Sequence, residues 1–296
     1  MSTLATNRDC IVEQAVLGEI APALARKGRY LRIAPDGTVS ALPGVGAITY
    51  NVRVGDSALK WRADHVEPGV SVKNDKEDAN AALNLLACVG NAAVLVSGEA
   101  KGARGVVTGK HGGIEHVLAD FAAEDVERMT IGDKVQVRAR GLGLELMEQA
   151  DVRVLNLGPD LLELMGLEPA GDRLRVPVTH RVPAAVMGSG IGNGDALSGD
   201  YDIQLFDQEI VERFGLGTLR LGDVVAVIDA DHTYGRIYRG GAVSVGVVVH
   251  SCCSQAGHGP GVTTLLTSAS GRIEPVIDAG ANIANYLKIG TAREGR

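Results

Sequence analysis

The stretch HSCCSQAGHGPG, residues 250–261, collects side chains that bind metals or act as nucleophiles. It contains His250, the adjacent Cys252 and Cys253, and His258 between two glycines. Neutral imidazoles bind zinc, manganese or iron, especially together with carboxylate oxygens. The two cysteines have neither a C-x-x-C spacing nor a spacing to histidine that would activate a thiol, so we expect two free thiols without a catalytic role. The histidines are the stronger candidates.

Two Asp-x-Asp pairs offer carboxylates: Asp200 with Asp202 in SGDYDIQ, and Asp229 with Asp231 in VIDADH. Residues two apart on a strand face the same side, so each pair places two carboxylates together. That is costly unless a cation, an arginine or a shared proton offsets the repulsion. Alternatively, these Asp residues cap turns at strand ends. The predicted ligands of a divalent metal, which would be zinc, manganese or magnesium, are Asp229, Asp231, His232 and His250.

Acid–base and substrate-binding roles follow from the same chemistry. Imidazole and carboxylate groups carry protons in catalysis, and the glycines of MGSGIGNG, residues 187–194, let backbone N–H groups approach a developing oxyanion. The predicted catalytic residues are Asp231, His232, His258 and Ser189. The predicted substrate-binding residues are Gly190, Gly257, Gly259, His111 and Arg236.

The composition excludes several classes of protein. The 296 residues carry a net charge of −7, and no run of Lys or Arg offers a nucleic-acid footprint. No apolar run approaches the roughly 18 residues of a membrane span, and the start lacks a secretory signal. We therefore expect a cytoplasmic protein that binds neither nucleic acid nor membrane. The 39 glycines are near twice ordinary usage and predict a loop-rich, largely β chain.

Strand patterns outnumber helix patterns. The run AVSVGVVVH, residues 242–250, is nearly all apolar and β-branched, so we expect a central strand buried on both faces with His250 at its end. If the strand that ends in DADH lies beside it, Asp229, Asp231 and His232 share one cavity with His250. Further predicted strands are 105–108, 115–121, 134–139, 152–155, 174–178 and 224–228. Predicted helices are 9–24, 78–86, 159–165, 207–214 and 280–287.

A recurring turn-strand pattern indicates small closed sheets. MTIGDKVQVRA (129–139) and LRLGDVVAVID (219–229) share a Gly-Asp turn followed by alternating valines. The turn in VLVSGEAKGARGVVTG (94–109) is similar to that of SH3-like barrels in ribosome-associated proteins. We expect a mainly β fold with a few short helices, a β-rich α+β class, with small SH3-like barrels beside a layered β domain. The predicted domains are 1–150, which includes a barrel, and 151–296, with glycine-rich loops.

Several segments resemble a family of bacterial and archaeal proteins of unknown function known from structural genomics. This resemblance implies a mainly β fold with small barrels beside a layered β domain, and it transfers no catalytic residues. Residues 176–200 also resemble acetamidase and formamidase, although they lack the Gly-Asp-x-His core of those enzymes. The segments of the first resemblance are 48–58, 64–71, 100–121, 176–190, 199–204 and 257–268.

Two functions remain open at this point. The first is a small-molecule enzyme, a hydrolase of an amide or cyclic amide that depends on a divalent metal. The alternative is a non-catalytic binding or sensor protein that recognises a small carboxylate or metabolite through the same loops. Short edge strands also favour a closed homo-oligomer. Turnover of a bound compound discriminates between the two functions.

Overall fold

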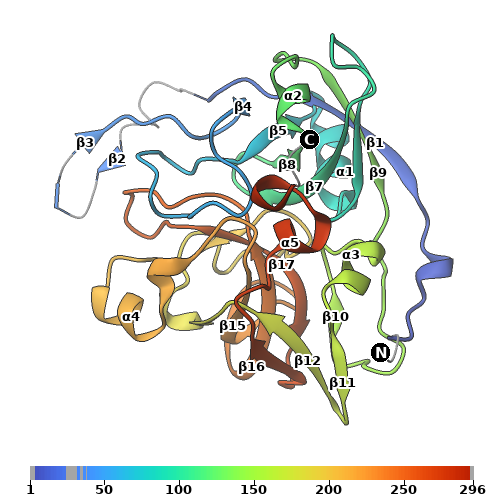
Figure 1. Cartoon of the computed structure of the whole chain (residues 1–296). Coiled ribbons are helices and arrows are strands. Elements are labelled where there is room, and N and C mark those ends of the chain that lie inside the picture. The colour runs from blue at the N-terminus through green and yellow to red at the C-terminus, as the bar shows by residue number, and fades with distance from the viewer. Residues whose placement is uncertain (1–3, 25–31, 34–35, 38, 294–296) are drawn as a thin grey trace.

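The computed structural model describes residues 4–24, 32–33, 36–37 and 39–293 (Figure 1). In this part of the chain, strands dominate and the five α-helices are short, which confirms the expected mainly β fold. None of these helices is long and apolar enough to cross a membrane.

Six strands of the N-terminal half close into a barrel. Their order is β1-β9-β6-β7-β8-β5, and pairing of β1 with β5 closes the ring, while β4 extends the edge at β5. Valine and alanine side chains fill the interior because alternate residues of each strand point inward. The strands are β1 (Gln14–Ile20), β4 (Ile48–Thr49), β5 (Gly69–Lys73), β6 (Ala92–Leu95), β7 (Arg104–His111), β8 (His116–Asp120) and β9 (Lys134–Ala139). The expected barrel is confirmed.

The helix predicted over residues 9–24 is wrong. A 3-10 turn, Arg8–Cys10, precedes β1, and burial alternates along that strand: Val16 and Ile20 are buried, while Leu17 is exposed. The spacing of the apolar residues in this segment fits both a helix and a strand. The segment forms a strand because it pairs with β9 on one side and β5 on the other.

The second sheet has the order β10-β17-β16-β15-β13, with β14 also paired to β17. β16 lies between β15 and β17, and its residues from Ala242 to Val248 are all buried, which confirms the predicted central strand. The strands are β10 (Arg153–Val154), β13 (His180–Pro183), β14 (Tyr201–Asp202), β15 (Val224–Asp231), β16 (Ile237–Val248) and β17 (Gly261–Ser268).

Smaller elements accompany these two sheets. Helices form inside four of the predicted ranges or one residue beyond them: α1 (Glu77–Leu86), α3 (Pro159–Leu164), α4 (Gln208–Arg213) and α5 (Ile283–Leu287). A short helix, α2 (Ala123–Val126), follows β8. The remaining strands are β2 (Arg32–Ile33), β3 (Val39–Ser40), β11 (Glu168–Ala170), β12 (Arg173–Val178) and β18 (Ile273–Ile277).

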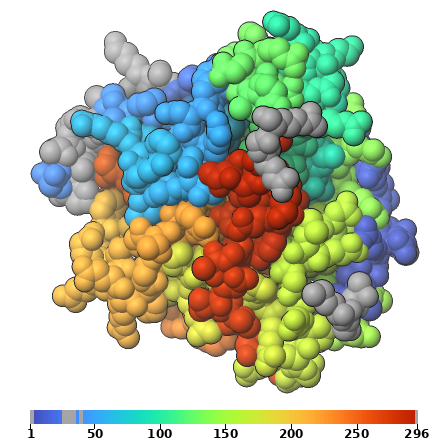
Figure 2. Space-filling view, in the orientation of Figure 1, coloured from blue at the N-terminus to red at the C-terminus, as the bar shows by residue number. Residues whose placement is uncertain are grey.

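The two halves of the chain share contacts and a core. One hydrophobic cluster includes Leu118 of the barrel together with Leu174 and Val245 of the C-terminal sheets. Figure 2 shows the C-terminal segment, in red, between the green barrel residues and the yellow and orange residues of the second half. Lys110 at the end of β7 donates its backbone N–H to Thr263 Oγ1 of β17. The barrel therefore presents the end of β7 to the start of β17. The predicted division of the chain near residue 150 stays a prediction.

Candidate metal centre

A cavity of about 520 Å³ lies between loops of both halves. Its lining includes the turn between β7 and β8, the glycine-rich loop before β14 and the loop before β5. The side chains around it that carry chemistry are His65, His111, Ser189, Asp200, Asp202, Arg236 and His258.

Each histidine near this cavity is placed by the end of a strand or by a tight loop. His111 ends β7 and His116 begins β8, so the two are opposite each other in one hairpin. His250 follows the buried strand β16, and His258 lies in the loop before β17. His65 has a φ of 53°, which is uncommon for a residue other than glycine and indicates a backbone held by its surroundings.

His111, Asp200 and His250 form the first group of possible metal ligands. One ligand atom from each lies within 4.8 Å of the other two. Asp200 Oδ2 is 2.7 Å from His250 Nε2, which makes an ion pair when the imidazole is protonated, and neither buried atom has another hydrogen-bond partner among the described residues. A buried carboxylate oxygen and an imidazole nitrogen at this distance share either a proton or a bound cation.

Each of these three side chains has one further nitrogen or oxygen that is held by a hydrogen bond. His111 Nδ1 donates to Glu67 Oε1, and His250 Nδ1 donates to the carbonyl of Ser251 at 3.0 Å. Asp200 Oδ1 accepts the backbone N–H of Gly112 at 2.8 Å. Metal-binding histidines usually donate their second nitrogen in this way, which fixes the ring and leaves the other nitrogen for the metal.

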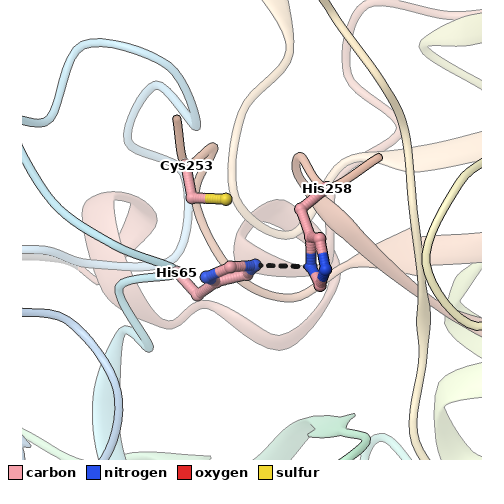
Figure 3. A group of neighbouring side chains, drawn as sticks. All are labelled: His65, Cys253 and His258. Atoms are coloured by element: carbon pink, nitrogen blue, oxygen red, sulfur yellow. Dashed lines mark hydrogen bonds between the residues drawn. The ribbon is translucent and has the colours of Figure 1, made fainter. Parts of the chain in front are cut away.

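His65, Cys253 and His258 form a second group, shown in Figure 3. His65 Nδ1 is 2.6 Å from Asp64 Oδ1, and its Nε2 faces His258 Nδ1 at 3.2 Å. Cys253 is a free, buried cysteine whose sulfur lies within 4.8 Å of both ligand nitrogens. The geometry makes Cys253 a possible ligand, and the expectation that neither cysteine takes part in a site stays a prediction.

Asp202 lies between the two groups. Its Oδ1 is 3.7 Å from His250 Nε2, while its Oδ2 is 3.1 Å from His258 Nδ1 and 3.7 Å from His65 Nε2. The backbone N–H of Gly259 donates to Oδ2 at 3.2 Å. One carboxylate therefore contacts both sets of imidazoles.

Neighbouring histidines lower the pKa values of three buried carboxyl groups. Burial opposes ionisation of Asp200 and Asp202, yet the pKa of each is lowered, chiefly by His250 for Asp200 and by His258 and His65 for Asp202. The pKa of Glu67 is likewise well below its usual value because His116 and His111 outweigh its burial.

The pKa values of the imidazoles are shifted as well, and not all in the same direction. Burial lowers the pKa of His65, but hydrogen bonds to Asp202 and Asp64 outweigh it and raise the pKa to about 12. Asp200 likewise raises the pKa of the buried His250. Burial and His250 instead lower the pKa of His111, which favours its neutral form. The cluster therefore favours cations at its centre.

A glycine leaves the space beside the first group. A Cβ built on Gly261, the first residue of β17, would overlap Asp200 Oδ2 and His250 Nε2. His116 adds another free nitrogen, since its Nδ1 contacts Glu67 while its buried Nε2 has no hydrogen-bond partner in the described chain.

The predicted ligands Asp229, Asp231 and His232 lie elsewhere, which corrects the expectation that they share a cavity with His250. They belong to neither group of possible ligands in the described residues. A bulge between Ile228 and Ala230, with a φ of 64° at Asp229, breaks the alternation that would place both carboxylates on one side.

The two Asp side chains and the imidazole have structural partners instead. Asp229 accepts from the backbone of Gly241, and Asp231 accepts from Thr233 and pairs with Arg239. His232 bonds to Thr264 Oγ1 at 2.7 Å and to Tyr201 Oη at 3.1 Å.

Other predicted residues lie at the cavity. His111, Ser189, Gly190, Arg236 and His258 line it. The remaining two predicted glycines bond to residues that line the cavity: Gly259 donates its N–H to Asp202, and the carbonyl of Gly257 accepts the N–H of Ser189 at 2.7 Å. Ser189 N–H is thus occupied, whereas its hydroxyl remains beside the cavity.

The sequence analysis did not single out His65, Glu67, His116 or Cys253 as candidate ligands, and it placed the metal on Asp229 and Asp231, whereas the possible ligands in the structure include Asp200. Asp200 and Asp202 flank Tyr201 in β14 and do face the same side, as the alternation rule requires. The one sequence feature that pointed to Asp200 and Asp202 was the electrostatic cost of two adjacent carboxylates. Asp229 and Asp231 share that feature, so it could not discriminate between the two pairs.

Comparisons with known proteins place the chain in a family. Residues 31–163 match the N-terminal domain of unknown function DUF4438, and residues 164–287 match its C-terminal domain. The solved structure entitled "Crystal structure of TM1086" matches with 46% sequence identity and a TM-score of 0.92, over 96% of this chain and 99% of that one. No curated protein matches, and the likeness to acetamidase and formamidase is not shown. The chain belongs to the DUF4438 family, as the resemblance predicted.

Proposed function

We propose that this protein is a divalent-metal-dependent hydrolase of an amide or cyclic amide in a small molecule. The observation that carries the proposal is the group of His111, Asp200 and His250 beside an open cavity, in which one ligand atom of each residue lies within 4.8 Å of the others and Asp200 Oδ2 and His250 Nε2 have no other hydrogen-bond partner among the described residues. Two imidazoles and one carboxylate are a donor set that suits zinc, manganese or iron.

Three protein ligands leave a coordination position for water. A metal in such a site lowers the pKa of its bound water to about 7, which supplies hydroxide at neutral pH. His111 and His250 are held by Glu67 and by the carbonyl of Ser251, so they keep their inner nitrogens aimed at the ion.

The reaction is an addition of water across the C–N bond. The water oxygen bonds to the carbonyl carbon, the C–N bond then breaks, and the nitrogen takes the proton that water releases. The second proton of the water also goes to the nitrogen, so the products are a carboxylate and an ammonium ion, or a single amino acid where the amide is cyclic. Burial of the ligands keeps the local dielectric low and strengthens the effect of the ion on the carbonyl oxygen.

Arg236 is suited to orient the substrate. It is 1% exposed, lines the cavity, and uses its Nη2 to donate to the carbonyl of Ser198 at 2.7 Å. Its Nε is buried without a partner in the described residues. A guanidinium in this position favours a substrate that carries a carboxylate.

The same arginine favours the alternative function, a non-catalytic protein that binds a small carboxylate. Both functions place the ligand in this cavity, so binding alone does not separate them. Turnover does, because only the hydrolase releases an amine from the bound compound.

The test uses protein purified without chelator and loaded with zinc or manganese. Amine release is measured over a panel of small amides and cyclic amides, with and without a carboxylate. We expect hydrolysis by the wild type and at least a hundredfold loss in Asp200→Asn, because a metal ligand is removed. Asp231→Asn is the matched control and keeps full activity, since Asp231 pairs with Arg239. If the compounds bind but none is hydrolysed, the binding function stands instead.

A further inference from the structure

We propose that the centre holds two metal ions, with the second bound by His65, Cys253 and His258 and with Asp202 bridging the pair. The inference deepens the proposed function, and it rests on that proposal for the first ion alone. Its own support is the second group of side chains, which hydrolysis at one ion does not require.

The nitrogens of the second group are arranged as ligands. His65 Nδ1 is engaged by Asp64, so Nε2 is the nitrogen available at the centre, and it faces His258 Nδ1 at 3.2 Å. Two imidazole nitrogens that face each other need a shared proton or a cation between them. In a tetrahedral zinc site with bonds of about 2.0–2.1 Å, two nitrogen ligands lie a little over 3 Å apart.

Cys253 fits the role of ligand better than that of nucleophile. His65 and His258 line the cavity, whereas Cys253 is 5% exposed and is not part of the lining. A substrate in the cavity therefore meets the histidines first. A thiolate with two imidazoles and one carboxylate oxygen completes four ligands and selects zinc over magnesium.

Asp202 has the geometry of a bridge, which would give the first ion a fourth protein ligand and leave a fifth position for water. Oδ1 is directed toward His250 of the first group, and Oδ2 toward His258 and His65 of the second. The rings of His65 and His250 are 5.0 Å apart between centroids, so the two groups lie side by side. Hydrolytic two-metal sites hold their ions about 3.5–4 Å apart, a spacing that one carboxylate spans.

Charge balance favours two ions over one. Four buried carboxylates surround the centre: Asp64, Glu67, Asp200 and Asp202. The proposed Cys253 thiolate adds a fifth negative charge. One divalent ion offsets two of these charges, whereas two ions offset four of them while every imidazole stays neutral and free to bind. The nearby buried Lys110 contributes little, since it donates to Asn156 and to the carbonyl of Leu197 instead of to a carboxylate.

The experiment counts metal ions in the full-length protein after chelation and reloading with Co²⁺ or Zn²⁺. We expect two ions per wild-type chain, and with cobalt a near-ultraviolet thiolate-to-metal charge-transfer band. Cys253→Ser removes the band and one ion. Cys252→Ser is the matched control and keeps both, because Cys252 is outside the group. His258→Gln, at a half-buried position, provides a second variant in case Cys253→Ser does not fold.

Asp200→Asn separates this inference from the proposed function. It should lose the first ion while the thiolate band remains. One ion in the wild type that disappears in Asp200→Asn, with no thiolate band, overturns the second site and leaves the proposed function standing. Two ions that are both retained in Cys253→Ser and His258→Gln also overturn it. A metal-free protein that loses activity when Cys253 is alkylated overturns both and assigns the thiol as nucleophile.

Discussion

Asp200 Oδ2 lies 2.7 Å from His250 Nε2, and the pairing of the strands beside them brings these two residues together. Asp200 immediately precedes β14, which pairs with β17, and β17 pairs with β16, whose end leads to His250. The candidate centre is therefore built on a continuous sheet, and the hairpin of β7 and β8 supplies His111 from the barrel.

Gly261 gives a direct test of the space between these two side chains. In Gly261→Ala the new methyl group would overlap Asp200 Oδ2 and His250 Nε2, so we expect at least tenfold weaker metal binding. The backbone of Gly261 has no positive φ, and the variant should still fold. Metal affinity is measured by competition with a chromophoric chelator. Gly240→Ala is the control, because no atom lies within 4 Å of its added Cβ; equal affinity in both variants contradicts the location of the site.

Glu67 should act through the histidine that it holds. Its carboxylate contacts His111 Nδ1 and His116 Nδ1, and it does not face the cavity. We expect Glu67→Gln to weaken metal binding by about 10–100-fold, the usual cost of losing such a partner. The melting temperature of the metal-free variant, measured beside the wild type, separates this effect from a loss of fold. Unchanged affinity in a folded variant would remove Glu67 from the centre.

The sequence predicted the barrel, the central strand and the place of His250 because each rests on local patterns. Alternating valines and Gly-Asp turns predict strands regardless of how those strands pack against the rest of the protein. The helix expected at 9–24 failed because its apolar spacing fits two periods, and only pairing with β9 decides between them. Asp229 was misplaced because a single bulge reverses the side to which a residue points, and no pattern of residue types reveals that bulge.

The sequence could not predict which side chains come together in the candidate site, and the reason is different. His65 and Cys253 come from loops in opposite halves of the chain, and their approach depends on how the barrel docks against the second sheet. Spacing within the sequence carries no information on that docking. A rule based on neighbouring residues finds Asp200 with Asp202, but not the imidazoles that surround them.

His232 should make stability depend on pH in a defined direction. Burial, with a contribution from Arg236, lowers its pKa from 6.5 to about 3, so the folded protein keeps this imidazole neutral. Between those values the unfolded chain binds more protons, and stability therefore falls as pH decreases from about 6.5 toward 3. We expect metal-free wild type to lose more stability between pH 8 and pH 5 than His232→Gln does. Urea unfolding in the presence of chelator measures this, and equal losses would contradict a buried neutral imidazole.

Chelation should lower the melting temperature of protein purified with its metal. An ion that binds only the folded state stabilises it by mass action, by about 2.7 kcal/mol at a free concentration one hundred times the dissociation constant. The loss on chelation should be reversed by added zinc or manganese in the wild type and in Asp231→Asn. In Asp200→Asn the reversal should be smaller, because one of the buried ligands is gone while the repulsion from Asp202 is reduced as well. Calorimetric scans of the three proteins with and without metal measure these melting temperatures. If neither ion changes the melting temperature of any of them, protonated His65 and His250 alone offset the carboxylates of this centre. In that case no metal takes part in its chemistry.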